Sequence, residues 1–358
     1  MKKLNMKAIV FLISFLVPLY VFSHKKEKIQ KEFYRLINVN PNSQLNINNY
    51  NGDLNFEVWF KNEIEIKVII EVTTPKINKI NKYIEAISVL ESNDSTNINF
   101  RTTIDKTKLD ASFHNGRSEF KVTYYVKHPV YLNLNLNNTN GNIYIDELSG
   151  NLNINLKNGT IYINKLTTDE TKKIPFISLI HSKAVIKKSE FIEANLFYSK
   201  IIIDNTKSVK IVSEKSNVEI KNAYLASLKC NYDIVSINEV NKLDLKSKYS
   251  KTNIFKIYEY ANFIGEYDDI TVTNLVSNFT EATFDLSFAN LDLGLTNDVC
   301  TKIVSNVKYS NIDLPKRANV DNYITLRDKR TTGTIGCISN AYSNLSINAE
   351  FSNINIHF

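Results

Sequence analysis

The sequence predicts an all-β chain that winds into a single β-helix-like solenoid of short strands, with one short N-terminal helix. A short pattern recurs along the chain: an aromatic residue or Asn, a small polar turn residue, one free position, and a β-branched residue or Leu. Consecutive copies between Val185 and Ile270 are 16 to 18 residues apart, too close for a helical repeat. Each copy leads into apolar–polar alternation, the period of a strand.

Residues 1–23 are predicted to be a secretory signal peptide. Three lysines precede an apolar run over residues 8–22, and Ser23 offers a cleavage position. The run is shorter than the ~20 apolar residues of a spanning helix, and Pro18 interrupts it. We therefore expect export to the periplasm, the outer cell surface or the medium, with no transmembrane segment after cleavage.

Residues 24–130 are predicted to be a β-rich region that caps the solenoid. Alternating runs at 45–47, 54–58 and 63–72 predict strands. Pro75 then opens a segment in which Ile residues recur at helical spacing, which predicts a helix near residues 76–88. This segment places Ile77, Ile80, Ile84 and Ile87 on one face.

Residues 131–358 are predicted to be the solenoid coils. Strands of 4–6 residues would stack at ~4.8 Å and bury one aliphatic face per coil. Asn353–Phe358 is expected to be an uncapped final strand, and either its edge or the flat faces of the solenoid are expected to bind a partner. The apolar positions predicted to stack are Ile143, Ile161, Val185, Ile201, Val218, Val235, Thr252, Ile270, Leu291 and Ile312.

Tyrosines at equivalent turn positions have two interpretations. They form a structural ladder along the corner of the coils, or an aromatic strip that contacts a sugar or peptide. The residues concerned are Tyr198, Tyr232, Tyr249, Tyr267 and Tyr309.

Three cysteines and no C-x-x-C pair argue against a zinc knuckle or a thioredoxin-like site. Cys300 and Cys337 are the candidate disulfide, because export permits one and both lie in the C-terminal third. The alternative is that all three are small buried hydrophobes.

No catalytic residue, metal site or cofactor is predicted. The five histidines have no metalloprotease spacing, and neither a nucleophile elbow nor a P-loop occurs. The formal charge of +7 falls to 7 − 3 = +4 without Lys2, Lys3 and Lys7, and no block of like charge suggests a nucleic-acid partner.

The strand from Trp59 to Ile66, the Pro75–Ile87 helix and the repeated Y-[SDN]-x-I coils together resemble the bacterial putative-adhesin, β-strand-repeat domain family of unknown function. The resemblance covers nearly the whole mature chain. It implies a right-handed β-helix-like fold on an exported protein and no catalytic residues. Many relatives carry more Gly in the repeated turn than this chain does.

The sequence therefore favours a non-catalytic, exported, adhesin-like or cell-envelope interaction protein with an unknown protein or glycan partner. The alternative is a carbohydrate-binding or polysaccharide-degrading β-helix protein. That alternative requires at least three carboxylate or basic residues to converge on one groove within ~10 Å.

Overall fold

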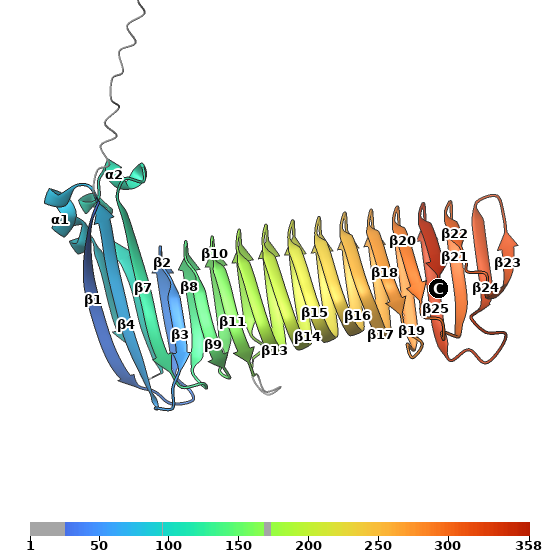
Figure 1. Ribbon diagram of the computed structural model, residues 1–358, viewed down its shortest axis with the longest axis horizontal. Helices are drawn as coiled ribbons and strands as arrows, with labels where there is room; N and C mark the ends of the chain where they lie inside the picture. The colour runs from blue at the N-terminus through green and yellow to red at the C-terminus, as the bar shows by residue number, and fades with distance from the viewer. Residues whose placement is uncertain (1–25, 95, 168–172) are drawn as a thin grey trace, which may run out of the picture.

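The chain forms an elongated stack of β-rungs with additional strands at each end (Figure 1). The computed structural model describes residues 26–94, 96–167 and 173–358, so the predicted signal peptide lies outside the described residues. Helical structure in these ranges is confined to four short segments near the N-terminal end. The predicted all-β solenoid-like fold is confirmed.

Each rung has two strand segments joined by a tight turn at one long edge, and neighbouring rungs pair in parallel. In the centre of the stack, β13 to β17 each supply one segment to two consecutive rungs. The strands of the rungs are β2 (Gln44–Tyr50), β3 (Leu54–Val58), β8 (Asn133–Thr139), β9 (Ile143–Leu148), β10 (Leu152–Lys157), β11 (Thr160–Leu166), β12 (Phe176–Ile180), β13 (Lys183–Phe197), β14 (Lys200–Glu214), β15 (Asn217–Asn231), β16 (Ile234–Lys248), β17 (Lys251–Glu266), β18 (Asp269–Leu275), β19 (Glu281–Ser287), β20 (Asn290–Leu295), β21 (Thr301–Lys308), β22 (Asn311–Asp313), β25 (Ser343–Glu350) and β26 (Asn353–His357).

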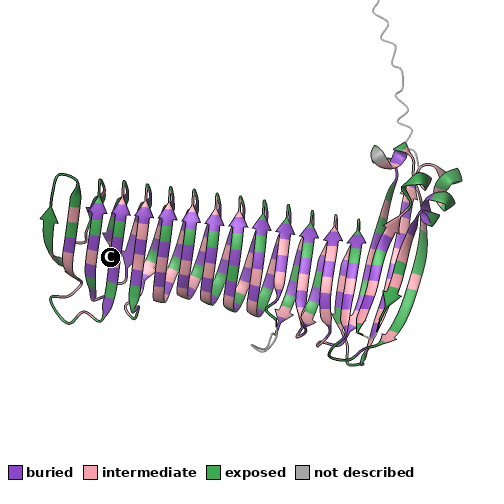
Figure 2. Ribbon diagram, turned by 180° about the vertical axis from the view of Figure 1, so that it is seen from behind, coloured by how far each residue is buried: buried purple, intermediate pink, exposed green. Residues whose placement is uncertain are grey.

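The core lies between the two faces of the stack and follows its long axis (Figure 2). Alternation within each strand sends every second side chain inward, and the parallel register places equivalent residues directly above one another. One inward column is isoleucine at seven consecutive rungs, each at most 2% exposed: Ile145, Ile163, Ile186, Ile203, Ile220, Ile237 and Ile254. Stacking thus removes from water an apolar face that one rung alone could not bury.

The predicted inward column holds, with one correction. Val218, Val235 and Ile270 are buried at equivalent positions of nearby rungs. Val185 does not join them: Ala184 takes the inward position next to Ile201, and Val185 faces outward. A one-residue slip exchanges the two faces of a strand, and the small Ala184 at the inward position gives a weaker apolar signal than the neighbouring Val185.

The predicted strand length of 4–6 residues is wrong for the centre of the stack. Strands β13 to β17 are 15 or 16 residues long. At the second long edge two outward residues precede one inward residue, as at Lys221, Asn222 and Ala223. This extra outward residue turns the chain while pairing with the neighbouring rungs continues, so one strand covers both faces.

The N-terminal region covers one end of the stack with antiparallel strands. Strand β4 pairs with β1 and β7, and β5 pairs with β6, while β6 and β7 pair in parallel with β2 and β3. These elements are β1 (Glu27–Asn38), β4 (Glu63–Thr74), η1 (Ile77–Lys79), α1 (Ile80–Glu85), β5 (Ile87–Asn93), β6 (Asn97–Ile104), η2 (Lys106–Lys108), α2 (Ala111–His114) and β7 (Glu119–His128).

Two local predictions in this region need correction. The helix expected near 76–88 is shorter, because Ile87 already begins β5 and Ile77 is 60% exposed. The strand expected from Trp59 begins only at Glu63, since residues 59–62 form the connection between β3 and β4. In both cases the local sequence pattern continues beyond the element it predicts, and the actual boundary lies where pairing with a neighbouring strand begins, at Glu63 and at Ile87.

The C-terminal strands do not lie at the end of the stack, contrary to the predicted docking edge. Strand β26 pairs with β20 on one side and β22 on the other, and β25 lies between β19 and β21. The label that marks the C-terminus in Figure 1 accordingly stands inside the stack. Residues 343–357, last in sequence, therefore form the penultimate rung.

The far end of the stack is covered on one face by a hairpin rather than left open. Strand β24 (Asp328–Ile335) pairs antiparallel with β21, and β23 (Ala318–Ile324) pairs antiparallel with β24. The hairpin extends past the stack in Figure 1. Antiparallel strands thus finish both ends of a parallel stack, which reduces the exposure of unpaired edges.

Candidate binding surface

The turns that join the two strands of each rung line one long edge of the molecule. Twelve rungs place a non-glycine residue with positive φ at the first turn position, from Asn51 (φ 65°) to Tyr309 (φ 48°). Asn tolerates this left-handed backbone, whereas a bulky residue adopts it only where the surroundings compensate. The twelve residues, in spatial order, are Asn51, Asn140, Asn158, His181, Tyr198, Lys215, Tyr232, Tyr249, Tyr267, Phe288, Phe351 and Tyr309.

Stacking of the rings supplies that compensation. Tyr249 stacks on Tyr232 at 4.8 Å and on Tyr267 at 4.9 Å, with the rings within 7° of parallel. Phe288 and Phe351 extend this ladder to Tyr309 at the same spacing. The spacing matches the ~4.8 Å between strands, so the backbone repeat sets the ring repeat.

The five predicted tyrosines thus lie on one edge but not in one uninterrupted strip. Lys215 separates Tyr198 from Tyr232, and Tyr198 stacks instead on His181 at 5.3 Å. Within the ladder each inner ring has both faces covered, so it offers solvent only an edge and, for Tyr249 and Tyr267, a hydroxyl group. This arrangement favours the structural-ladder interpretation, because a sugar ring packs on an aromatic face.

The second turn position shows how close the rungs approach. The first three turns have Gly there, and a Cβ on Gly141 would lie 1.9 Å from the carbonyl oxygen of Gly52. Later turns have Ser or Asp in place of Gly, except for Ala289, and the Ser and Asp side chains join a hydrogen-bond ladder. The backbone N–H of Ser199 donates to Ser216 Oγ (3.0 Å), and the Ser216 hydroxyl donates to the carbonyl of Glu214 (2.8 Å).

This polar ladder was not predicted from the sequence, although its signal was present: a Ser or Asp directly follows the first residue of most later turns. Two of its members are buried carboxyls, Asp233 and Asp268, each 2% exposed. Asp233 contacts Ser213 Oγ at 2.6 Å and accepts from the N–H of Ser216. Burial raises the pKa of both carboxyls above the ordinary 3.8, against the opposing effect of these hydrogen bonds.

Replacing both carboxyls is expected to change the pH dependence of stability. A carboxyl whose folded pKa is raised binds more protons in the native state, so its contribution is complete below pH 3.8 and is lost as the pH rises through the folded pKa. Asp233→Ser with Asp268→Ser should therefore flatten the decline of unfolding free energy above pH 4, by about 1.4 kcal/mol per unit of pKa shift. Urea titrations across pH 3–8 measure it. Asp269→Ser, at an exposed position, is the control, and identical profiles for all three proteins would contradict the prediction.

A groove runs along the face formed by the second half of each rung, beside the aromatic ladder. It has a volume of about 1210 Å³ and follows nine rungs from β12 to β21. Two outward columns form its banks, two residues apart along each strand, and the inward residue between them forms its floor. At ~4.8 Å per rung the groove is about 38 Å long, and its banks are about 7 Å apart.

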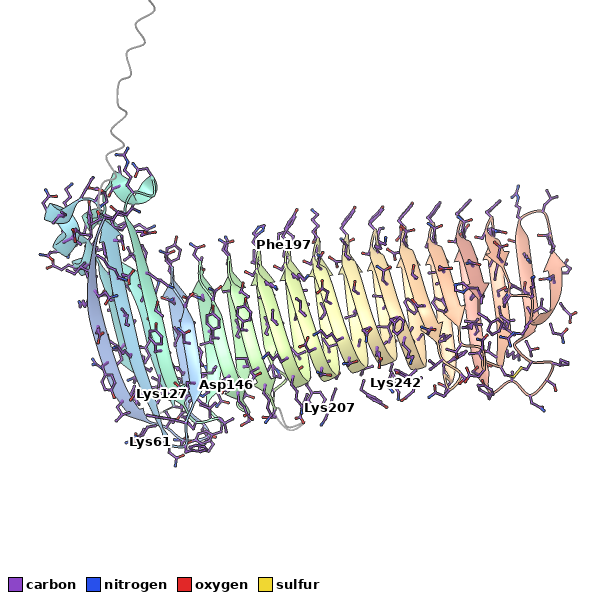
Figure 3. The ribbon with its side chains drawn as sticks, in the orientation of Figure 1. Lys61, Lys127, Asp146, Phe197, Lys207 and Lys242 are labelled. Atoms are coloured by element: carbon purple, nitrogen blue, oxygen red, sulfur yellow. A yellow bond between two sulfur atoms is a disulfide. The ribbon has the colours of Figure 1, made fainter. Side chains whose placement is uncertain are left out.

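The floor and banks are chemically mixed. The floor side chains are smallest over the middle rungs. There Ser213, Cys230, Ser247 and Gly265 occupy the position that is leucine in β12 and β13. One bank ends each rung directly before the aromatic turn residue, as Phe197 does before Tyr198. Figure 3 shows Phe197 near this edge, with Lys207 and Lys242 at the opposite edge.

The glutamates on the banks are neutralised by lysines. Glu266 pairs with Lys248 (3.0 Å) and Glu350 with Lys308 (3.7 Å). Glu214 likewise lies 3.8 Å from Lys215. Charged groups of both signs therefore do meet in this groove, as the polysaccharide-degrading alternative required. Each of these three carboxylates nevertheless has a cationic partner rather than the isolation expected of a general acid.

The remaining candidate groups fit structural roles. Cys300 and Cys337 form a disulfide, with their Cα atoms 5.2 Å apart. Cys230 is buried, and burial raises the pKa of its thiol to about 12, which disfavours the nucleophilic thiolate. Burial also lowers the pKa of His128. Among residues 26–94, 96–167 and 173–358, no group of three or more potential metal ligands occurs, and no helix is long and apolar enough to cross a membrane.

No protein-family model matches the chain, and no curated protein matches it. Two solved structures are similar in part. One is a putative cell adhesion protein from Clostridium sporogenes, 12% identical, with a TM-score of 0.20 over 92% of this chain and 99% of that chain. The other is a putative adhesin from Bacteroides fragilis, 16% identical, with a TM-score of 0.32 over 68% of this chain and 97% of that chain. Scores this low carry no argument about function.

Proposed function

We propose that this protein is an exported, non-catalytic, adhesin-like binding protein that holds a ligand of the cell envelope or its surroundings against one face of a rigid β-solenoid. The observation that carries the proposal is the groove along nine rungs. Its banks are fixed by strands paired on both sides, so the ligand meets a preformed surface and little ordering free energy is lost on binding.

Export rests on the basic and apolar start of the sequence, and the disulfide agrees with an oxidising compartment. The non-catalytic assignment rests on the ion-paired glutamates of the groove. The aromatic ladder contributes a stiff edge to the surface. A binding role for Tyr198, Tyr232, Tyr249, Tyr267 and Tyr309 remains part of the proposal, and for the inner rings Tyr249 and Tyr267 it is limited to ring edges and hydroxyl groups.

Blocking the groove is expected to abolish binding. Asn195→Trp places an indole on one bank, where the native side chain is exposed, and should reduce binding to isolated cell envelopes at least about tenfold. Asn222→Trp, exposed at the opposite edge, is the matched control and should bind as the unmodified protein does. Cosedimentation of residues 24–358 with envelopes measures both, after circular dichroism has shown native folding.

Fractionation of periplasm, outer membrane and medium tests export in the same strain. Equal binding by the two tryptophan variants would remove the groove from the proposal, and a cytoplasmic location would overturn it. Release of new polysaccharide ends during incubation would favour the degrading enzyme instead.

A further inference from the structure

Within the described residues, two lysines in the middle of the groove lack the ion-pair partners that its glutamates and its other lysines have. Asp285, on the same bank as these lysines, accepts a hydrogen bond from Asn348 (2.7 Å) and likewise has no ion pair. Lys229 and Lys246 lie on the same bank in direct register, one rung apart, and both are exposed. Neither forms an ion pair within the part of the chain that the structure describes. Like charges held directly opposite each other on neighbouring strands are destabilising, so an anion placed between them would be stabilised by both.

The surroundings of this lysine pair are apolar along the groove. Val212 precedes Lys229 and Ile264 follows Lys246 on the same bank, and they are 44% and 41% exposed. Phe197 and Ile180 continue the apolar stretch on the other bank. Uncharged hydrogen-bonding side chains alternate with these groups, among them Asn195 and Asn231. A ligand that fits this lining carries carboxylates, apolar patches and many hydroxyl groups.

The backbone of the stack argues against a peptide in this place. The strands under the groove pair with both neighbours, so they have no free N–H or C=O groups to offer an added chain. A peptide lying across them would leave its own amides against apolar side chains, at a cost in free energy. A second copy of the same groove would present its own Lys229 and Lys246.

We infer that the groove binds a linear acidic polysaccharide, whose carboxylates lie at Lys229 and Lys246. This inference rests on the proposed function and names the ligand class. The sugar rings would pack their C–H faces on Val212 and Ile264, and their hydroxyl groups would reach the amides on the banks. A linear polymer of repeating units suits a surface that repeats once per rung and extends for about 38 Å.

The test compares polygalacturonate with a neutral dextran of matched length, using residues 24–358 and isothermal titration calorimetry. Lys229→Gln with Lys246→Gln should weaken polygalacturonate binding by about tenfold or more, since two charge-assisted contacts are lost. Lys207→Gln with Lys242→Gln removes the same charge at the opposite edge and should leave affinity within about twofold. Lys229→Arg with Lys246→Arg should retain binding, and higher salt should weaken it.

Three results would overturn the inference: unchanged affinity in the glutamine variant, equal binding of dextran, or equal binding of poly-L-glutamate as a generic polyanion. If the unmodified protein ignores polygalacturonate yet loses envelope binding through Asn195→Trp, the proposed function stands and the acidic polysaccharide is excluded. If the unmodified protein binds neither polygalacturonate nor isolated cell envelopes, both this inference and the proposed function fail. Light scattering measures whether the protein is a dimer in solution. A dimer whose formation is blocked by Asn195→Trp would show that a second copy occupies the groove, and would also overturn the inference.

Discussion

Replacing Ile347 with Asp is expected to destabilise the protein by about 4 kcal/mol or more and to release the C-terminal end of the stack. Ile347 is fully buried on β25, between Phe284 on β19 and Ser305 on β21. A carboxylate there would have neither water nor a cationic partner. Equilibrium urea unfolding measures the loss, and limited proteolysis locates it.

The position of the rung decides how far the damage spreads. Among the described residues, β26 is the one strand that pairs with β22, and β25 is the one strand through which β21 pairs with the other rungs. Ile347→Asp should therefore expose β21 to β24 to protease together with β25. Asn344→Asp, exposed three residues earlier on the same strand, is the matched control and should unfold as the unmodified protein does. Cleavage confined to residues 343–358 would contradict the interior position of this rung.

The repeat itself could be predicted from sequence because it depends on local patterning. Apolar alternation after each turn specifies which side chains face inward, and the residues at the turns specify where the chain reverses. Ala184 shows the limit of this reasoning, since a small residue in a register set by its neighbours leaves a weak apolar signal. Strand lengths failed for a related reason: only pairing with both neighbours carries β13 to β17 through the second edge.

The order of the rungs could not be predicted. The turns at Tyr309 and Phe351 have nearly the same sequence pattern, Tyr-Ser-Asn-Ile and Phe-Ser-Asn-Ile, so either rung could stack next to β20. Contacts far apart in sequence decide between them. Among these, the guanidinium carbon of Arg317 lies 3.8 Å from the centre of the Phe358 ring, so the segment beyond β22 holds the chain terminus in place.

The groove was also beyond sequence reasoning, although every residue in it was visible. Lys229 and Lys246 are 17 residues apart and look like two of many surface lysines. Only the register brings them together, and only the ion pairs of the groove's glutamates and other lysines make their lack of ion-pair partners informative within the described residues. The Tyr column, by contrast, was visible from spacing alone, but the covering of its ring faces was not.

Removing the disulfide is expected to cost about 4 kcal/mol, the second large effect. Cys300 and Cys337 are 37 residues apart, and closing a loop of this length removes roughly that much conformational entropy from the unfolded chain. The bond joins the start of β21 to the segment that leads into β25. The chain therefore leaves the stack, builds the last rung and its hairpin, and returns to the same point before forming the penultimate rung.

This geometry predicts where the effect of disulfide loss appears. Cys300→Ser with Cys337→Ser should lower the unfolding free energy and increase amide hydrogen exchange in β21 to β24, while β13 to β16 stay protected, because rungs interact mainly with their nearest neighbours. A reductant should bring the unmodified protein to the level of the serine variant and leave that variant unchanged. Equal stability of the reduced and oxidised protein would show that strand pairing through β25 alone holds the last rung, and that the disulfide does not contribute to closing this end of the stack.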